Sequence, residues 1–514
     1  CSSDTQDRIK EMIEEHSLNR VIVASCTPRT HEPLFRDTIR EAGLNPYLFE
    51  MANIRDQCSW VHMHEPETAT TKAKELVRMA VAKARLIEPL HITPVPVTDG
   101  ALVIGGGIAG MTAGLNLADQ GFAVHLVERE AELGGHLRHI RYLVGGASDP
   151  QEELAKAISR VEAHPNITVW ASAAVRRVDG FVGNFVTTIE QDGQETLVEH
   201  GAVIVATGAA EHTPTEYRYG SDERVITQHE LEDRLAEGKL DAKRVVMIQC
   251  VGSREGERMY CSRVCCTQAV KNALKIKTDQ PGTDVYVLYR DLRTYGFREE
   301  YYTLARRSGV RFLRYEADEK PQLSDVDGRL RVEAFDPVLN APLEIDADLL
   351  VLAPPIVPHE DAEEVAQMLK VPLTSEGFFL EAHMKLRPID FSADGVFLAG
   401  LAHSPKGVDE TIAQAQATAA RAATILSKDE YTPEAIIASV DEELCAGCGL
   451  CVSVCSYDAP ELVAVRGRQI SRINQALCKG CGACAGACPS GAMQQLGFRP
   501  KQIAEMVSAA LECV

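Results

Sequence analysis

The sequence lacks the basic charge that binding to nucleic acid demands. Its 53 Lys and Arg residues are outnumbered by 74 Asp and Glu residues, which gives a formal charge of -21 at pH 7. A phosphate backbone is held by a basic face, so this composition excludes nucleic acid as the expected partner. We expect proteins and small cofactors as partners instead.

Long apolar runs and targeting signals are also missing. No stretch reaches the roughly 20 apolar residues that cross a bilayer, and the first residues show neither a charged n-region nor an apolar h-region. We therefore expect no membrane span and a cytoplasmic location. Because the first residue is Cys1 rather than Met, this expectation concerns only the residues of the given sequence.

Cysteine, in contrast, is plentiful and unevenly spread. Three of the 16 cysteines lie in the first 58 residues, four lie between Cys250 and Cys266, and eight lie between Cys445 and Cys488. The reducing thiol pool of a cytoplasm disfavours disulfides, so dense groups of this kind predict metal ligands.

The C-terminal cysteines form two groups with the spacing C-x₂-C-x₂-C-x₃-C, the second followed by Pro489 where the first has Ser456. Three closely spaced thiolates take three corners of a cubane, and the fourth corner comes from the other group. The alternative is zinc, which takes four thiolates in two C-x₂-C pairs. The predicted ligands are Cys445, Cys448, Cys451 and Cys488 for one 4Fe-4S cluster, and Cys478, Cys481, Cys484 and Cys455 for the other.

A glycine motif indicates a dinucleotide site in the middle of the chain. The apolar run 101–104 ends in G-x-G-x-x-G, and we expect a helix from Met111 to Gln120 and a strand at 123–128 after it. The first glycine makes the turn, the second lets backbone approach a pyrophosphate, and the third lets helix and strand pack. A glycine-rich turn without a ligand is the alternative. The candidate residues are Gly105, Gly107, Gly110, Glu128, whose carboxylate accepts from ribose hydroxyls, and the adjacent Arg129.

Later segments favour FAD over NAD as the ligand. They resemble the L-G-G turn, the A-T-G strand end and the closing helix of two-dinucleotide-binding, thioredoxin-reductase-like flavoproteins, although Leu401 stands where Asp is usual. A helix that aims its N-terminus at the ring favours an anionic reduced flavin. The residues concerned are Gly135, His136, Ala206, Thr207, Gly208, Gly400, Lys406, Gly407 and Val408, the last of which begins a helix to Leu426.

The second dinucleotide motif of such flavoproteins is missing. The strand that begins at Arg244 runs into Gln249-Cys250-Val-Gly-Ser instead of G-x-G-x-x-G, and Cys265 and Cys266 are adjacent rather than spaced as a C-x-x-C dithiol. Direct reduction by a nicotinamide is therefore not expected.

Four long segments carry a family resemblance, at 26–35, 50–62, 260–277 and 402–416. They resemble the A-type chain of heterodisulfide reductase, and the resemblance spans nearly the whole sequence. It implies that FAD splits electron pairs between low-potential ferredoxin and a high-potential acceptor on partner subunits in anaerobic metabolism such as methanogenesis. Longer members insert a further ferredoxin domain between His136 and Ile167, where this chain has only a short segment.

The resemblance also implies partners. These are B- and C-type subunits of the reductase, a hydrogenase or formate-dehydrogenase module joined through a small iron-sulfur protein, and ferredoxin, assembled as a dimer of heteromers. The alternative function is a self-contained NAD(P)H-dependent ferredoxin or glutamate-synthase-type reductase. A scaffold with purely structural centres is a further alternative.

The remaining cysteines are candidates for one or two more 4Fe-4S clusters. The resemblance assigns one to Cys250, Cys261, Cys265 and Cys266, and the alternative is that these are buried structural cysteines. A second additional cluster would use Cys1, Cys26 and Cys58. The alternative is again that these are buried structural cysteines.

One basic side chain is a candidate for tuning the flavin. Lys406, in the Ser-Pro-Lys-Gly loop at the expected ring edge, is placed to lend positive charge near the reactive ring nitrogen, with His403 as a weaker candidate. The alternative for Lys406 is an ordinary solvated lysine.

The expected fold is α/β, with a two-dinucleotide-binding FAD core between an N-terminal α/β domain and a C-terminal α+β ferredoxin-like domain. The expected N-terminal domain includes a helix from Thr70 to Leu90. The segments are 1–92 for the N-terminal domain, 98–240 and 356–427 for the FAD domain, 241–355 for the second Rossmann-like domain, 434–498 for the ferredoxin domain and 499–514 for a C-terminal tail.

Overall fold

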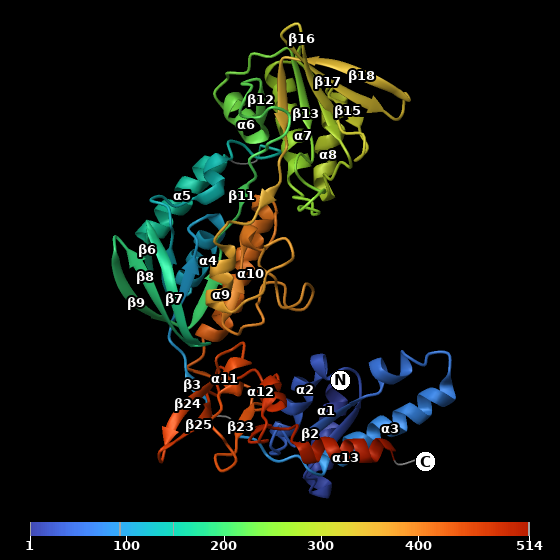
Figure 1. Ribbon diagram of the computed structural model, residues 1–514, viewed down its shortest axis with the longest axis vertical. Coiled ribbons are helices and arrows are strands. Elements are labelled where there is room, and N and C mark those ends of the chain that lie inside the picture. The colour runs from blue at the N-terminus through green and yellow to red at the C-terminus, as the bar shows by residue number, and fades with distance from the viewer. Residues whose placement is uncertain (1, 92–93, 147–148, 512–514) are drawn as a thin grey trace. The chain divides into compact units, whose positions relative to one another are not determined.

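The computed structural model describes residues 2–91, 94–146 and 149–511 and divides into two compact units (Figure 1). One unit joins the two ends of the chain, residues 1–95 and 432–514, and the other holds residues 96–431. Among the described residues, no helix combines the length and the apolar character needed to cross a membrane. The fold is α/β with an added α+β module, as the sequence predicts.

The first half of the unit 96–431 is built on a five-stranded parallel sheet with the order β21-β10-β4-β5-β6. The central strands β4 and β10 are buried along their whole length, as expected for a parallel sheet covered on both faces. An antiparallel sheet of β7 (Ala173–Phe181), β8 (Asn184–Gln191) and β9 (Gln194–His200) adjoins it. The parallel strands are β4 (Gly100–Ile104), β5 (Ala123–Val127), β6 (Ile167–Trp170), β10 (Ala202–Val205) and β21 (Val396–Leu398).

The second half repeats this plan. Its parallel sheet has the order β12-β19-β13-β14-β15, so β13, β14 and β15 take the places of β4, β5 and β6, and β19 returns beside β13 as β10 does beside β4. The antiparallel sheet β16-β17-β18 matches β7-β8-β9. The strands are β12 (Val225–Thr227), β13 (Arg244–Ile248), β14 (Asp284–Tyr289), β15 (Arg311–Arg314), β16 (Gln322–Val326), β17 (Arg329–Asp336), β18 (Ala341–Ala347) and β19 (Leu349–Leu352).

Helices cover these sheets, and a two-stranded ribbon of β11 (Ala210–Glu211) and β20 (Ile356–Val357) joins the halves. Helix α6 begins with a capping box in which Thr227 and Glu230 satisfy each other's backbone N–H groups. The helices are α4 (Ile108–Ala118), α5 (Pro150–Ala163), α9 (Ala362–Leu369) and α10 (Val408–Leu426) in the first half, and α6 (Gln228–Ala236), α7 (Cys265–Asp279) and α8 (Glu299–Arg307) in the second.

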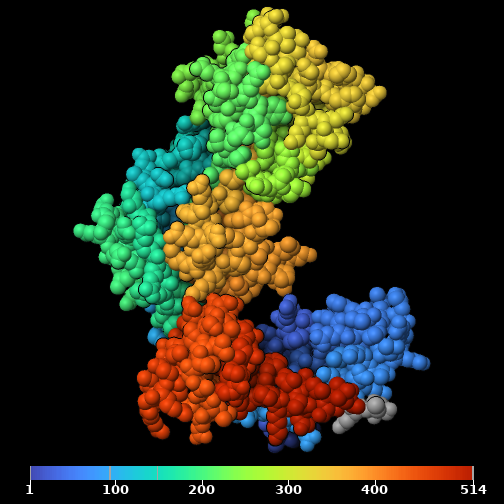
Figure 2. All heavy atoms as spheres, in the orientation of Figure 1, coloured from blue at the N-terminus to red at the C-terminus, as the bar shows by residue number. Residues whose placement is uncertain are grey.

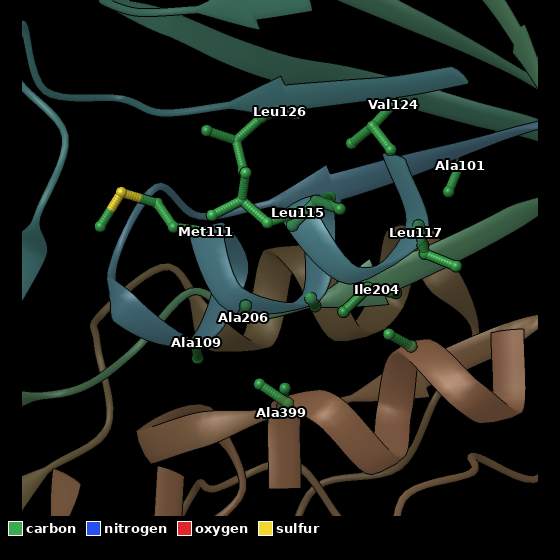
Figure 3. Packing of buried hydrophobic residues seen from close by; sticks show 14 of the residues in the cluster. Ala101, Ala109, Met111, Leu115, Leu117, Val124, Leu126, Ile204, Ala206 and Ala399 are labelled. Atoms are coloured by element: carbon green, nitrogen blue, oxygen red, sulfur yellow. The ribbon is translucent and has the colours of Figure 1, made fainter. Parts of the chain in front are cut away.

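The core of the first half lies between α4, the parallel sheet and α10. Figure 3 shows Met111 and Leu115 of α4 packing beneath Leu126 of β5, with Ala399 on the opposite side of the helix. Small side chains at the α4–α10 contact let the two helix backbones approach closely, and this brings the N-terminal ends of both helices to the same part of the fold.

The unit formed by the chain ends combines a small α/β domain with the ferredoxin-like module. Helix α13 packs on α3, where Gln502 Nε2 donates to the Leu86 carbonyl oxygen at 3.0 Å and Lys83 Nζ lies 4.0 Å from the centre of the Phe498 ring. In Figure 2 the red C-terminal residues lie against the blue N-terminal ones. The elements are α1 (Ser3–His16), β1 (Val21–Ser25), α2 (Pro28–Glu41), β2 (Phe49–Asn53), η1 (Arg55–Ser59), α3 (Pro66–Ala84), β23 (Ala438–Val440), α11 (Leu450–Ser453), β24 (Pro460–Val465), β25 (Arg468–Ile473), α12 (Ala483–Ala487), β26 (Met493–Gln495) and α13 (Pro500–Leu511).

Three boundaries differ from the expectation. The helix expected over 70–90 is α3 and begins earlier, at Pro66, a residue suited to the first helical turn. Residues 499–514 include helix α13. The helix expected over 111–120 is α4 and begins at Ile108, so that Gly110 lies inside it. A Cβ at Gly110 would lie 1.8 Å from the Gly105 carbonyl oxygen, and this close approach is why glycine occurs within a helix here.

Candidate functional site

The turn that follows β4 forms one end of a cavity of about 830 Å³. Gly105 has φ +112°, and a Cβ there would lie 2.3 Å from the Ala206 carbonyl oxygen, so only glycine fits. At Gly107 a Cβ would meet nothing within 4 Å, and the residue lines the cavity as the cap of α4. The turn thus leaves a cradle in front of the unpaired N–H groups of the first turn of α4, which suits a pyrophosphate.

Two charged residues follow β5 at the rim of this cavity. Glu128 is buried, and its Oε2 accepts from the Gly106 N–H at 2.6 Å while its Oε1 accepts from the Glu130 N–H at 2.9 Å. The Arg129 guanidinium lies 3.1 Å from the ring nitrogens of His359 and 3.1 Å from Asp361 Oδ2. Glu128 lines the cavity, and its contact with a ribose stays a prediction. His359 also lines the cavity, but the sequence does not indicate it because it lies far along the chain.

A second cavity, of about 380 Å³, continues from the first and shares His136, His229 and Leu401 with it. It is lined by the N-terminal end of α10, by α7 and by the aromatic residues of the loop before α8. Thr267 Oγ1 in its wall is buried and has no hydrogen-bond partner among the described residues. The two cavities together form a long site with a dinucleotide end and a ring end, and the residues present therefore fit FAD.

The predicted cofactor residues divide between these two ends. Gly110 and Gly400 line neither cavity: a Cβ at Gly400, whose φ is +73°, would lie 2.7 Å from the Ala109 Cβ, so both glycines serve packing. The dinucleotide end is lined by Gly105, Gly107, Glu128, Arg129, Gly135, His136, Ala206, Thr207 and Gly208, and the ring end by His136, Lys406, Gly407 and Val408.

Lys406 is half-buried and held by backbone at the ring end. Its Nζ donates to the carbonyl oxygens of Gly400 at 2.6 Å and Ser404 at 2.9 Å. Burial, and after it the positive charge of Arg263, lowers the pKa of Lys406 to about 7. The side chain therefore changes its charge near neutral pH, which an ordinary solvated lysine does not do.

Two histidines lie where the cavities meet, and only His136 was expected at the site. The His136 and His229 rings are 4.9 Å apart, and His229 Nδ1 lies 3.2 Å from Glu211 Oε2. Burial lowers the pKa of His136 to about 3 and raises the pKa of Glu211 to about 8. His229 and Glu211 carry no local motif and are brought here only by the joining of the two halves.

The ferredoxin-like module brings its cysteines together in the predicted crossed arrangement. A cavity is lined by Cys445, Cys448, Cys451 and by Cys488 of the other motif. Burial, together with the nearby thiols of Cys478, Cys455 and Cys481, raises the pKa of Cys484 to about 11. Backbone N–H groups point at several of these sulfurs, as from Met493 to Cys488 Sγ at 3.4 Å and from Ala438 to Cys478 Sγ at 3.3 Å.

The four cysteines of the second Rossmann-like half also come together, at the turn after β13 and the start of α7. Burial raises the pKa values of Cys250, Cys265 and Cys266, and each is raised further by other members of the group, including Cys261. Cys250 has φ +61°, which is strained for a residue with a side chain. Among the described residues no three Cys, His, Asp or Glu side chains close around a single ion. A cubane instead places each thiolate on a different iron.

The N-terminal cysteines are not brought together by any contact in the described chain. Cys26 follows β1 and Cys58 lies in η1, after the neighbouring strand β2. Cys58 donates its thiol hydrogen to the Ala69 carbonyl oxygen at 2.9 Å, and Arg55 Nη1 approaches Cys26 Sγ at 3.6 Å. Cys1 lies outside the described residues. A cluster at this end of the chain stays a prediction.

Comparison with known proteins finds two family matches along the chain. Residues 100–248 match the pyridine nucleotide-disulphide oxidoreductase family, and residues 436–513 match the 4Fe-4S dicluster domain. The chain is 40% identical to an A-type iron-sulfur chain of the CoB--CoM heterodisulfide reductase of Methanopyrus kandleri, over 91% of this chain and 86% of that protein. It is 38% identical to the A-type chain of the H(2):CoB-CoM heterodisulfide,ferredoxin reductase of Methanothermobacter thermautotrophicus, over 89% of this chain and 84% of that protein.

The chain belongs to the family of A-type chains of heterodisulfide reductase. It is therefore an oxidoreductase component that carries FAD and 4Fe-4S clusters. Among solved structures, thioredoxin reductase from Lactococcus lactis matches with a TM-score of 0.46 and 18% identity, over 64% of this chain and 99% of that chain.

The comparison also shows that this chain is shorter than its relatives in places. The alignment to the Methanopyrus kandleri protein covers 569 positions, more than the 514 residues of this chain, so the relative contains residues that this chain lacks. Between the flavin turn and β6, where the family resemblance places an extra ferredoxin domain, this chain has the short helix η2 (Gly135–His139) and α5.

Proposed function

We propose that this chain passes electrons between FAD and its 4Fe-4S clusters inside a heterodisulfide reductase-type complex in the cytoplasm, and that electron pairs are split at the flavin. In that role FAD takes up electrons in pairs and passes them on one at a time. One electron goes to ferredoxin and the other to a disulfide or another high-potential acceptor on partner subunits. The residues proposed to hold FAD are Gly105, Gly107, Glu128, Arg129, Gly135, His136, Ala206, Thr207, Gly208, Lys406, Gly407 and Val408.

The observation that carries the proposal is the position of the four-cysteine loop. Val264 lines the ring end of the flavin cavity, and the next residue, Cys265, belongs to the cysteine group. A cluster held by Cys250, Cys261, Cys265 and Cys266 would therefore lie beside the flavin ring. In this half of the fold cysteines stand where a nicotinamide motif would be, which favours electron exchange through clusters.

The proposed partners are B- and C-type subunits, ferredoxin and a hydrogenase or formate-dehydrogenase module, in a dimer of heteromers. The names of two relatives support ferredoxin and a hydrogenase or formate-dehydrogenase module, since they include ferredoxin, H(2) and formate. The ligands proposed for the two C-terminal clusters are the crossed sets of four cysteines described above.

A coupled assay on the anaerobically purified native complex tests this function. Ferredoxin reduction should require the high-potential acceptor, and the complex with Cys481→Ala in this chain should keep FAD but stop transfer to partners. Ser456→Ala, beside a ligand but not one itself, is the control. Rapid bleaching of the flavin by NADH or NADPH alone would instead support the self-contained reductase.

A further inference from the structure

One arginine connects the four-cysteine loop to the ring end of the flavin cavity. Arg263 lies between Cys261 and Cys265 in the left-handed region, with φ +60°. Its backbone N–H donates to Cys261 Sγ at 3.3 Å. Its side chain leaves the cysteine loop, and its Nη1 donates to the Pro405 carbonyl oxygen at 3.3 Å. Pro405 directly precedes Lys406.

The same guanidinium also contacts the beginning of α10. Arg263 Nη2 donates to Glu410 Oε1 at 2.9 Å and to the Tyr295 hydroxyl at 3.1 Å. Glu410 Oε2 in turn accepts from the Gly407 N–H at 3.0 Å and from the Tyr295 hydroxyl at 2.8 Å. Arg263 therefore holds residues on both sides of Lys406, through Pro405 before it and through Glu410 and Gly407 after it.

We propose that Arg263 is a positioning residue that ties the loop of the four-cysteine centre to the loop of Lys406, so that a change at the cysteines alters the setting of Lys406 in the flavin cavity. This inference rests on the proposed flavin and cluster sites. It deepens that function, because it identifies a physical link between the two redox centres. A planar guanidinium suits the task, since its fork of donors reaches several acceptors at once.

The charges that face Lys406 make the link measurable. Arg263 lowers the pKa of Lys406, whereas Glu410 and Glu381 raise it. His403, which bonds Glu381 at 3.0 Å, is a further titratable neighbour of Lys406. Removing the Arg263 cation should therefore raise the Lys406 pKa, and freeing Glu410 from its ion pair acts in the same direction.

The test is the pH dependence of Lys406 acetylation by acetic anhydride, measured by peptide mass spectrometry on the full chain loaded with FAD and iron. We expect a midpoint near pH 7 in the wild type, and a midpoint higher by about one pH unit in Arg263→Gln. Arg298→Gln is the matched control, because Arg298 lines the same cavity and lies over the Tyr295 ring at 5.0 Å but bonds Asp409 rather than Pro405 or Glu410. That control should leave the midpoint unchanged.

Arg263→Lys separates charge from tethering. It keeps the cation, so the midpoint should stay near that of the wild type, while amide hydrogen exchange of residues 404–407 should accelerate because the fork of hydrogen bonds is lost. An unchanged midpoint in Arg263→Gln, or unchanged exchange in Arg263→Lys, would overturn the proposal.

A double-mutant cycle tests the link itself. Cys261→Ala should raise the Lys406 midpoint when Arg263 is present and add little in Arg263→Gln, because both changes break one connection. Shifts that add in full would show that the loops are independent and would overturn the inference. Failure of the underlying function gives a different result, in which Cys261→Ala costs the chain no iron.

Discussion

The two Rossmann-like halves share a strand order but differ at the turn after the first strand. After β4, three residues separate the strand from α4, and the turn is glycine with an open cradle at Gly107. After β13 the chain makes a longer loop, and α7 begins only at Cys265. The residue at the end of the second strand differs as well, Glu128 in one half and Arg290 in the other.

On the proposed assignment, this difference lets one fold serve two kinds of redox centre. A parallel sheet gathers the loops at the carboxyl ends of its strands, and the chemistry depends on which side chains those loops carry. In the first half the loops present backbone N–H groups, which suit phosphates. In the second they present thiols, which suit iron.

The largest effect is expected from filling the cradle of the first half. Gly107→Val should lower FAD affinity by about a hundredfold or more, because the side chain would occupy the pyrophosphate position. The backbone tolerates the change, since Gly107 has φ -71° and its Cβ would meet no atom within 4 Å. FAD content and thermal unfolding of the purified chain are the measurements.

Gly282→Val is the control for this change, because Gly282 is exposed and also has nothing near its Cβ. It should keep both FAD and stability. Full flavin content in Gly107→Val would show that the cradle does not hold the cofactor.

A smaller effect is expected from Lys406 and depends on pH. Below its pKa of about 7 the side chain is cationic and stabilises the anionic reduced flavin; above that pH it is neutral and the stabilisation is lost. Lys406→Met should therefore lower the flavin potential by about 30 mV below pH 7, if the lost interaction is about one pKa-unit equivalent. Above roughly pH 8 the difference should disappear.

Spectroelectrochemical titration at several pH values measures the flavin potential of each variant. Lys428→Met, an exposed position just beyond α10, is the control and should leave the potential unchanged. If the flavin potentials of the wild type and Lys406→Met differ by the same amount at every pH, Lys406 does not titrate at the ring.

The smallest effect concerns the strained turn of the second half. In iron-free chains, Cys250→Gly should be more stable than Cys250→Ala by about 1 kcal/mol, because only glycine adopts positive φ without cost. At Cys266, inside α7, the order should reverse, since alanine is the better helix former. Denaturant unfolding of the four variants checks both signs, and the same order at both sites would refute the argument.

The sequence predicted the parts of the site that depend on local patterns. Residues close together in the chain determine the glycine turn and the strand that follows it. They also determine the bounds of α10 and the spacing within the two cysteine motifs. The sequence places the start of helix α4 three residues late, at Met111 instead of Ile108, because the helix is counted from the residue after the G-x-G-x-x-G motif. Glycine is required at position 110 because the Gly105 carbonyl oxygen lies where a Cβ would be, and the local sequence pattern does not reveal this contact.

Residues that act through distant contacts could not be predicted. His229 and Glu211 reach the cavity only because the two halves join, and Arg263 matters through Glu410, which lies 147 positions away. Each of these side chains alone is typical of an ordinary surface residue. Helix α13 likewise depends on its packing against α3.

Iron and flavin counted together in one variant test the central claim most directly, namely that the second half holds a 4Fe-4S cluster where the first holds FAD. Cys265→Ala should lower the iron content of the anaerobically prepared chain by about four atoms while the FAD content stays at the wild-type level. Unchanged iron in this variant would contradict the account, because the four cysteines would then be structural.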